Sequence, residues 1–156
     1  MATAATASSE RLRHLIARYA DDAHVHVQPC PGLADAIERG LLCGPALLDV
    51  LKPHCDAIRA ANVDTVVLGC THYAFVESSI RASLGTQVNV IDTATAITER
   101  SASLWEQSLP GFDSSPAVRV VSTGATGTMQ LLLAECAGLD HITVEVLTII
   151  PSTLPG

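Results

Sequence analysis

The eight residues from Val67 to Ala74, Val-Leu-Gly-Cys-Thr-His-Tyr-Ala, decide how this chain of 156 residues folds. The apolar run that leads into them, Val63 to Leu68, is short and rich in β-branched residues, which predicts a strand covered on both faces. A thiol, a hydroxyl and an imidazole follow this strand at Cys70, Thr71 and His72. Open α/β sheets bind ligands outside the carboxyl ends of their strands, so these side chains occupy the expected position of a site.

Helices and strands alternate along the rest of the chain. We expect the first helix to be capped by Ser8 or Ser9. The alternation predicts an α/β fold, a mainly parallel sheet with helices on both faces and right-handed crossovers. The helical spacing predicts helices over 10–19, 33–42, 45–61, 75–84, about 94–110 and 129–137, and Gly40 marks either the end of the second or a break in it. The strand patterns fall at 24–27, 63–68, 88–92, 117–121 and 142–147.

Two stretches predict connections. Gly124 and Gly127 bracket a predicted turn, and residues 111–116 are the most linker-like part of the sequence. These residues fit either a boundary between two lobes or an ordinary surface loop.

Composition restricts the classes of protein that fit. Apolar residues make up 48% of the chain and charged residues 16%, which is typical of a globular protein. Nine Lys and Arg against sixteen Asp and Glu give a net charge of −7, so nucleic acid and anionic membranes are not expected partners. Residues 1–9 lack a basic segment followed by an apolar one, and no run approaches the ~18 apolar residues of a membrane span. We therefore expect a cytoplasmic protein.

The five cysteines are odd in number and irregularly spaced, which favours free thiols over a disulfide framework. Three close pairs, namely Cys70 with His72, His54 with Cys55, and His24 with His26, lack the spacings that make a zinc site convincing, so we expect no metal. The residues alone leave two interpretations of Cys70 open. It is either a working thiol with His72 as its hydrogen-bond partner and Thr71 as a carboxylate contact, or a packed core cysteine beside an exposed histidine.

Residues 67–73 resemble the second signature of the glutamate racemases, cofactor-independent enzymes that make D-glutamate for bacterial peptidoglycan. The segment Gln28–Leu33 followed by Ile37–Gly40, and the strand-turn Val121–Gly124, are similar to further parts of that family. The resemblance therefore covers nearly the whole chain. It is also specific, because the related aspartate racemases typically carry Glu at the position of His72.

The resemblance implies a racemisation of glutamate by two cysteines, with no cofactor. Cys70 matches the second catalytic cysteine, His72 the histidine that assists it, and Thr71 a contact to the substrate carboxylate. Glu38 falls where the family has an acidic residue near the active site, although a glutamate near a helix end is more often a solvated surface charge. Inversion at carbon requires an acid/base group on each face, which is why two thiols are needed.

The chain departs from the family pattern in two ways. Ala74 replaces the usual proline, and neither the Asp-Ser-Gly motif nor the Cys-Asn-Thr-Ala motif, which carries the first catalytic cysteine, is found. The other cysteines, Cys30, Cys43, Cys55 and Cys136, lie in unsuitable contexts. We therefore expect residues 1–92 to form the second lobe, incomplete at its start, and residues 93–156 to return to a mostly missing first lobe.

Such a chain holds one of the two bases and should not racemise glutamate alone. It should also expose apolar surface and self-associate, so a homodimer is among the expected partners. The alternative interpretation is a non-catalytic glutamate-binding or interaction domain of the same fold. A thiol hydrolase is a weaker alternative, because no oxyanion-loop motif is evident.

Overall fold

The computed structural model describes residues 1–108, 119–124, 126–135, 139 and 141–146. The chain divides into two compact units, Met1–Pro110 and Gly111–Gly156. This division falls beside the linker-like stretch 111–116, which lies outside the described residues. The predicted lobe boundary between residues 92 and 93 differs from it, and the assignment of the lobes stays a prediction.

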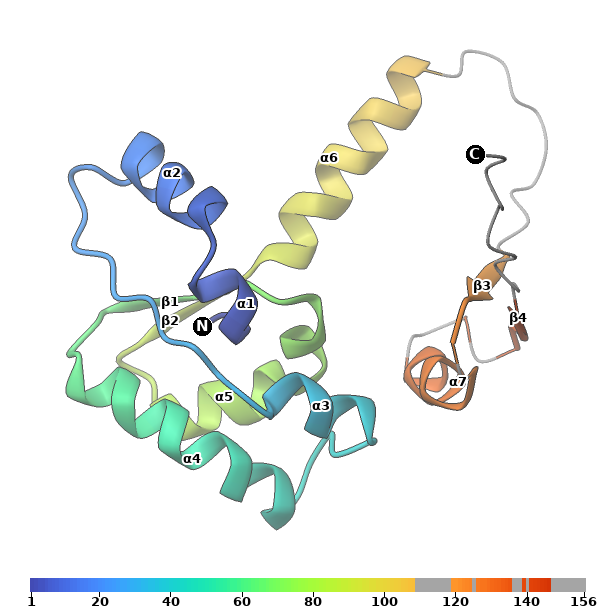
Figure 1. The fold of residues 1–156 in the computed structure, drawn as a ribbon, viewed down its shortest axis with the longest axis horizontal. Helices are drawn as coiled ribbons and strands as arrows, with labels where there is room; N and C mark the ends of the chain where they lie inside the picture. The colour runs from blue at the N-terminus through green and yellow to red at the C-terminus, as the bar shows by residue number, and fades with distance from the viewer. Residues whose placement is uncertain (109–118, 125, 136–138, 140, 147–156) are drawn as a thin grey trace, which may run out of the picture. The chain divides into compact units, whose positions relative to one another are not determined.

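The first unit contains a parallel pair of strands flanked by helices, which confirms the α/β class (Figure 1). Strands β1 (Thr65–Leu68) and β2 (Asn89–Asp92) pair with Val66 opposite Val90 and Val67 opposite Ile91. Its elements are α1 (Ala4–Ala7), α2 (Glu10–Tyr19), α3 (Leu33–Glu38), α4 (Pro45–Ala60), β1 (Thr65–Leu68), the 3₁₀ helix η1 (Thr71–Val76), α5 (Glu77–Leu84), β2 (Asn89–Asp92) and α6 (Thr93–Ser108).

The core lies on one face of this strand pair, where α4 and α5 run side by side (Figure 1). Val66, Leu68 and Val90 are buried on that face. The helices contribute apolar side chains at helical spacing, and all are fully or nearly fully buried: Leu47, Leu51, Cys55 and Ile58 from α4, and Ile80 and Leu84 from α5. Burial of this kind is worth roughly 1.5–3 kcal/mol for each large aliphatic side chain.

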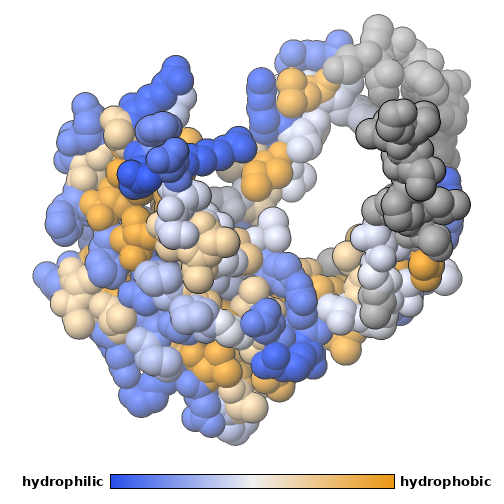
Figure 2. Space-filling view, in the orientation of Figure 1, coloured by the Kyte–Doolittle hydropathy of each residue, from blue (hydrophilic) through white to orange (hydrophobic). Residues whose placement is uncertain are grey.

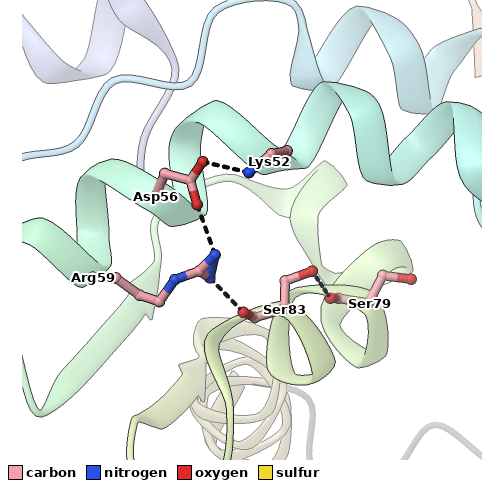
Figure 3. Close-up of polar contacts among 5 residues, drawn as sticks. All are labelled: Lys52, Asp56, Arg59, Ser79 and Ser83. Atoms are coloured by element: carbon pink, nitrogen blue, oxygen red, sulfur yellow. Dashed lines mark hydrogen bonds and ion pairs between the residues drawn. The ribbon is translucent and has the colours of Figure 1, made fainter.

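Arg59 links α4 to α5 through polar contacts (Figure 3). Its guanidinium donates to the Ser83 carbonyl at 2.7 Å and to Asp56 Oδ1 at 2.7 Å. Lys52 donates to the other Asp56 oxygen at 2.9 Å. These side chains are half to nearly three-quarters exposed, so the two ion pairs, which lie within α4, add little stability. The hydrogen bond from Arg59 to the Ser83 carbonyl is the contact that joins the two helices.

The opposite face of the strand pair is open to solvent, which contradicts the prediction of a strand covered on both faces. Val67 and Ile91, which lie opposite each other, are 46% and 43% exposed. β1 is therefore half-buried, because only alternate residues face the helix layer. Ile97, Leu104 and Trp105 of α6 are also exposed. Apolar patches interrupt the hydrophilic surface on the face drawn in Figure 2.

Most predicted elements of the first unit are confirmed. Helix α2 is capped by Ser9, whose hydroxyl accepts from the Leu12 amide at 3.2 Å. The helix predicted from residue 33 ends at Glu38, close to Gly40, the predicted end or break, which has φ 83°. The strand predicted over 24–27 is wrong. Its alternating residues have no ladder partner among the described residues, and pairing begins only with the bridge between Ala2 and Pro29.

The second unit contains a smaller parallel pair, β3 (Val120–Ser122) and β4 (Val144–Val146), with α7 (Thr126–Ala134) between them. Both strands and the helix were predicted, although parts of the predicted ranges lie outside the described residues. Gly127 belongs to the first turn of α7 rather than to a turn before it. In the described part of the chain, no helix has the length and apolar character needed to cross a membrane.

Candidate functional site

Cys70 lies just beyond the carboxyl end of β1 and is partly buried. Its backbone is extended, with φ −145° and ψ 132°, and its carbonyl accepts a hydrogen bond from the Tyr73 amide at 3.0 Å, which starts η1. The thiol thus stands where the strand turns into the following helix. This is the position predicted from the sequence.

Gly69 fixes the backbone immediately before the thiol. Its amide donates to the Met1 carbonyl at 2.9 Å, so residue 1 lies alongside the end of β1. A Cβ added at Gly69 would lie 3.1 Å from the same carbonyl oxygen, which is closer than most real contacts. A larger residue at this position would therefore require the Met1 carbonyl to shift by a few tenths of an ångström.

A chain of polar side chains leads away from the thiol. Cys70 Sγ lies 3.8 Å from Nδ1 of His72, and Nε2 of His72 lies 3.0 Å from Oε1 of Glu38. A carboxylate only accepts hydrogen bonds, so Nε2 donates to Glu38 and the other ring nitrogen, Nδ1, faces the thiol. His72 can in this arrangement take a proton from Cys70 and return it.

Glu38 reaches this chain because α3 packs against η1. Leu33, Ala36 and Ile37 of α3 are completely buried, which leaves Glu38, the last residue of the helix, on the side of His72. Glu38 is about half exposed and His72 less so. The structure thus brings together Cys70, His72 and Glu38, the three residues predicted to act together.

Cys70 and Thr71 also line a shallow hollow whose other wall is α6. Thr93, the first residue of α6, donates from its hydroxyl to the Leu68 carbonyl at 3.1 Å and ties this helix to the end of β1. Asp92 Oδ1 accepts from the Ala94 amide at 3.0 Å and caps the helix. The lining residues are Gly69, Cys70 and Thr71 on one side and Thr93, Ala96, Ile97, Arg100 and Ser101 on the other.

The sequence interpretation missed this wall of α6. A signal was present, because these positions recur at helical spacing directly after β2, whose carboxyl end lies beside that of β1. The close approach of Met1 to Gly69 had no local signal.

The buried thiols are poor acid/base candidates. Burial raises the pKa of Cys30 to about 11 and also raises the pKa of Cys55. Burial, with the neighbouring Cys30 thiol, raises the pKa of Tyr73, whose hydroxyl is fully buried and has no well-formed hydrogen bond. These three groups stay protonated at neutral pH. Cys43 is exposed, and Cys136 lies outside the described residues.

Metal binding finds no support in the described ranges. Among their His, Cys, Asp and Glu side chains, no three lie close enough together to hold an ion.

Comparison with known proteins now identifies the class. The family model described as Asp/Glu/Hydantoin racemase matches residues 1–100, and the chain belongs to this family. Curated relatives are glutamate racemases, as the resemblance predicted. The one from Pseudomonas syringae pv. tomato is 39% identical over 108 residues, which is 69% of this chain and 39% of the relative. The one from Ectopseudomonas mendocina is 35% identical over 134 residues, or 85% of this chain and 51% of the relative.

Solved structures agree with this placement. Glutamate racemase isoform RacE1 from Bacillus anthracis superposes with a TM-score of 0.76 at 26% identity, over 96% of this chain and 56% of that chain. Escherichia coli glutamate racemase, in complex with L-glutamate and the activator UDP-MurNAc-ala, gives 0.78 at 26% identity, over 96% and 57%. The chain thus spans about half the length of the racemases that it matches.

Proposed function

We propose that this chain is the Cys70-bearing part of a glutamate racemase and that Cys70 exchanges the α-proton of glutamate on one face, without a cofactor. The observation that carries the proposal is the contact chain from Cys70 through His72 to Glu38 beside an open hollow. The proposed product, D-glutamate, would serve bacterial peptidoglycan synthesis in the cytoplasm. The relatives named glutamate racemase support D-glutamate as the proposed product.

In the proposed step the Cys70 thiolate removes the proton from Cα. The electron pair of the C–H bond moves into the α-carboxylate, and the proton forms the new S–H bond. Thr71 donates its hydroxyl to that carboxylate and so stabilises the charge that develops there. An ordinary thiol is mostly protonated at neutral pH, so His72 takes the thiol proton beforehand while Glu38 stabilises the imidazolium.

Racemisation requires a second acid/base group on the opposite face of the carbon. Cys30 and Cys55 are buried and protonated, and neither lines the hollow. We propose that the second base comes from a polypeptide region outside these 156 residues. The 156-residue chain alone should therefore exchange the α-proton of one enantiomer and return it to the same face.

Proton exchange in D₂O tests this proposal. The purified chain is incubated separately with L- and D-glutamate, the loss of the α-proton signal is followed by NMR, and the configuration by chiral chromatography. We expect slow exchange of one enantiomer with retained configuration. Cys70→Ser should abolish the exchange, whereas Cys43→Ser, which changes an exposed cysteine, should leave it intact. Inversion of both enantiomers at a normal enzymatic rate would contradict the single-base mechanism.

A second candidate function is a non-catalytic glutamate-binding or interaction domain. The observation that favours it is the number of exposed apolar side chains on the strand pair and on α6, because apolar surface that is left open often serves an interaction. Such a surface could also join two copies of the chain. Glutamate binding without any α-proton exchange would favour this alternative. Sedimentation of the purified chain measures the self-association.

A further inference from the structure

Helix α6 presents one continuous face to the hollow beside Cys70. Its lining residues recur at intervals of three, four, seven and eight from Thr93, which places them on one side of the helix. Ala96 and Ile97 make the middle of this wall apolar, and Arg100 lies beyond them. The hollow therefore has a thiol and a hydroxyl at one end and a guanidinium on its far wall.

Arg100 is the only cationic side chain that lines this hollow, and the described residues provide it with no hydrogen bond or ion pair. In contrast, Arg59, Arg81 and Arg119 each pair with a carboxylate. Side chains of an α-helix lean toward its N-terminus, and that end of α6 is tied to β1 through Thr93. Arg100 lies about 10 Å further along the helix axis than Thr93, and both residues line the same hollow as Cys70.

We infer that Arg100 binds the distal carboxylate of the amino-acid substrate and so selects an acidic side chain; this inference rests on the proposed function. When Cα meets the Cys70 sulfur and the α-carboxylate meets Thr71, the side chain of glutamate leads away from the thiol. Its methylenes fit the apolar wall of Ala96 and Ile97. Its carboxylate then reaches Arg100, whose planar fork matches a carboxylate in a bidentate pair.

Binding of glutamate and glutamine to matched variants of the 156-residue chain tests the inference, because the two ligands differ only in the distal charge. Affinities are measured by calorimetry for the unaltered chain, Arg100→Gln, Arg100→Lys and Arg11→Gln. The last variant removes the same charge from an exposed site on α2. We expect Arg100→Gln to weaken glutamate roughly 10- to 100-fold and glutamine less than twofold, with Arg100→Lys in between and Arg11→Gln unchanged.

The outcomes distinguish a failure of this inference from a failure of the proposed function on which it rests. An equal loss of affinity for glutamate and glutamine in Arg100→Gln, or no loss for either, would overturn the role of Arg100 and leave the proposed function standing. If the unaltered chain bound neither ligand and exchanged no α-proton, the proposed function would fail, and the inference with it.

Discussion

Nε2 of His72 lies 3.0 Å from Oε1 of Glu38, although the two residues are 34 positions apart in the sequence. The contact joins the end of α3 to η1, and the buried side of α3 holds it in place. It orients the imidazole so that the other ring nitrogen, Nδ1, lies 3.8 Å from the Cys70 sulfur.

Replacing Glu38 with Gln tests this relationship. The amide keeps a hydrogen-bond acceptor but removes the charge that stabilises the imidazolium, so we expect α-proton exchange to slow about tenfold, the difference between a charged and a neutral hydrogen bond. Glu10→Gln, which neutralises an exposed glutamate on α2, is the matched control. An exchange rate in Glu38→Gln equal to that of the control would remove Glu38 from the mechanism.

Gly69→Ala should destabilise the first unit. The new Cβ would press on the Met1 carbonyl at 3.1 Å, a backbone atom held by its own hydrogen bond to the Gly69 amide. We expect a loss of about 1–3 kcal/mol in the free energy of unfolding, measured by urea denaturation. Gly124→Ala is the control, since nothing lies within 4 Å of its added Cβ. If both variants unfolded at the same urea concentration, the close approach at Gly69 would be unimportant.

Alkylation by iodoacetamide at pH 8 should distinguish the thiols. Cys43 is exposed and Cys70 partly exposed, whereas Cys30 and Cys55 are buried. A pKa of about 11 leaves roughly one Cys30 side chain in a thousand as thiolate at this pH. Mass spectrometry should therefore find Cys43 and Cys70 labelled first, and labelling of Cys30 only after denaturation in urea. Equal rates for Cys30 and Cys43 in the folded chain would refute the buried placement of Cys30.

His54 should make the stability of the chain depend on pH. Burial lowers the pKa of His54 below its ordinary value of 6.5, although a hydrogen bond to the Pro31 backbone opposes the shift. At pH values between the pKa of His54 in the folded chain and that in the unfolded chain, the unfolded chain binds more protons. The free energy of unfolding therefore decreases as the pH falls below about 6.5. We expect the urea midpoint to drop more between pH 7.5 and 5.5 in the unaltered chain than in His54→Gln.

The comparison between the two chains removes the contribution of all titratable groups that they share. Parallel pH profiles would show that His54 is not the group responsible.

Local patterns predicted much of the fold. The helical spacing of Leu47, Leu51 and Ile58 and the apolar run before Gly69 depend on neighbours in the sequence, and both elements are present. The strand predicted over 24–27 has the same kind of local pattern, but a strand exists only when a partner pairs with it. Likewise, Val67 would be buried only if a second layer of structure covered its face of β1, and the residues of the strand do not reveal whether such a layer is present.

The sequence predicted the part of the candidate site that lies in one continuous segment. Cys70, Thr71 and His72 follow a strand, and the resemblance added Glu38. The hydroxyl of Thr93 and the guanidinium of Arg100 were missed because they enter the site through the pairing of β1 with β2, a contact between distant parts of the chain. The roles of these residues in catalysis remain predictions.

The hydrogen bond between Gly69 and Met1 has a consequence for the order of folding. β1 and β2 are joined by a short crossover, whereas Met1 must close a loop almost three times as long, and the entropic cost of closure grows with loop length. We therefore expect the strand pair to form first and residues 1–2 to dock later. During synthesis, the hydrogen bond between Met1 and Gly69 can form only after Gly69 has emerged from the ribosome. The backbone beside Cys70 therefore reaches its final geometry only after that point.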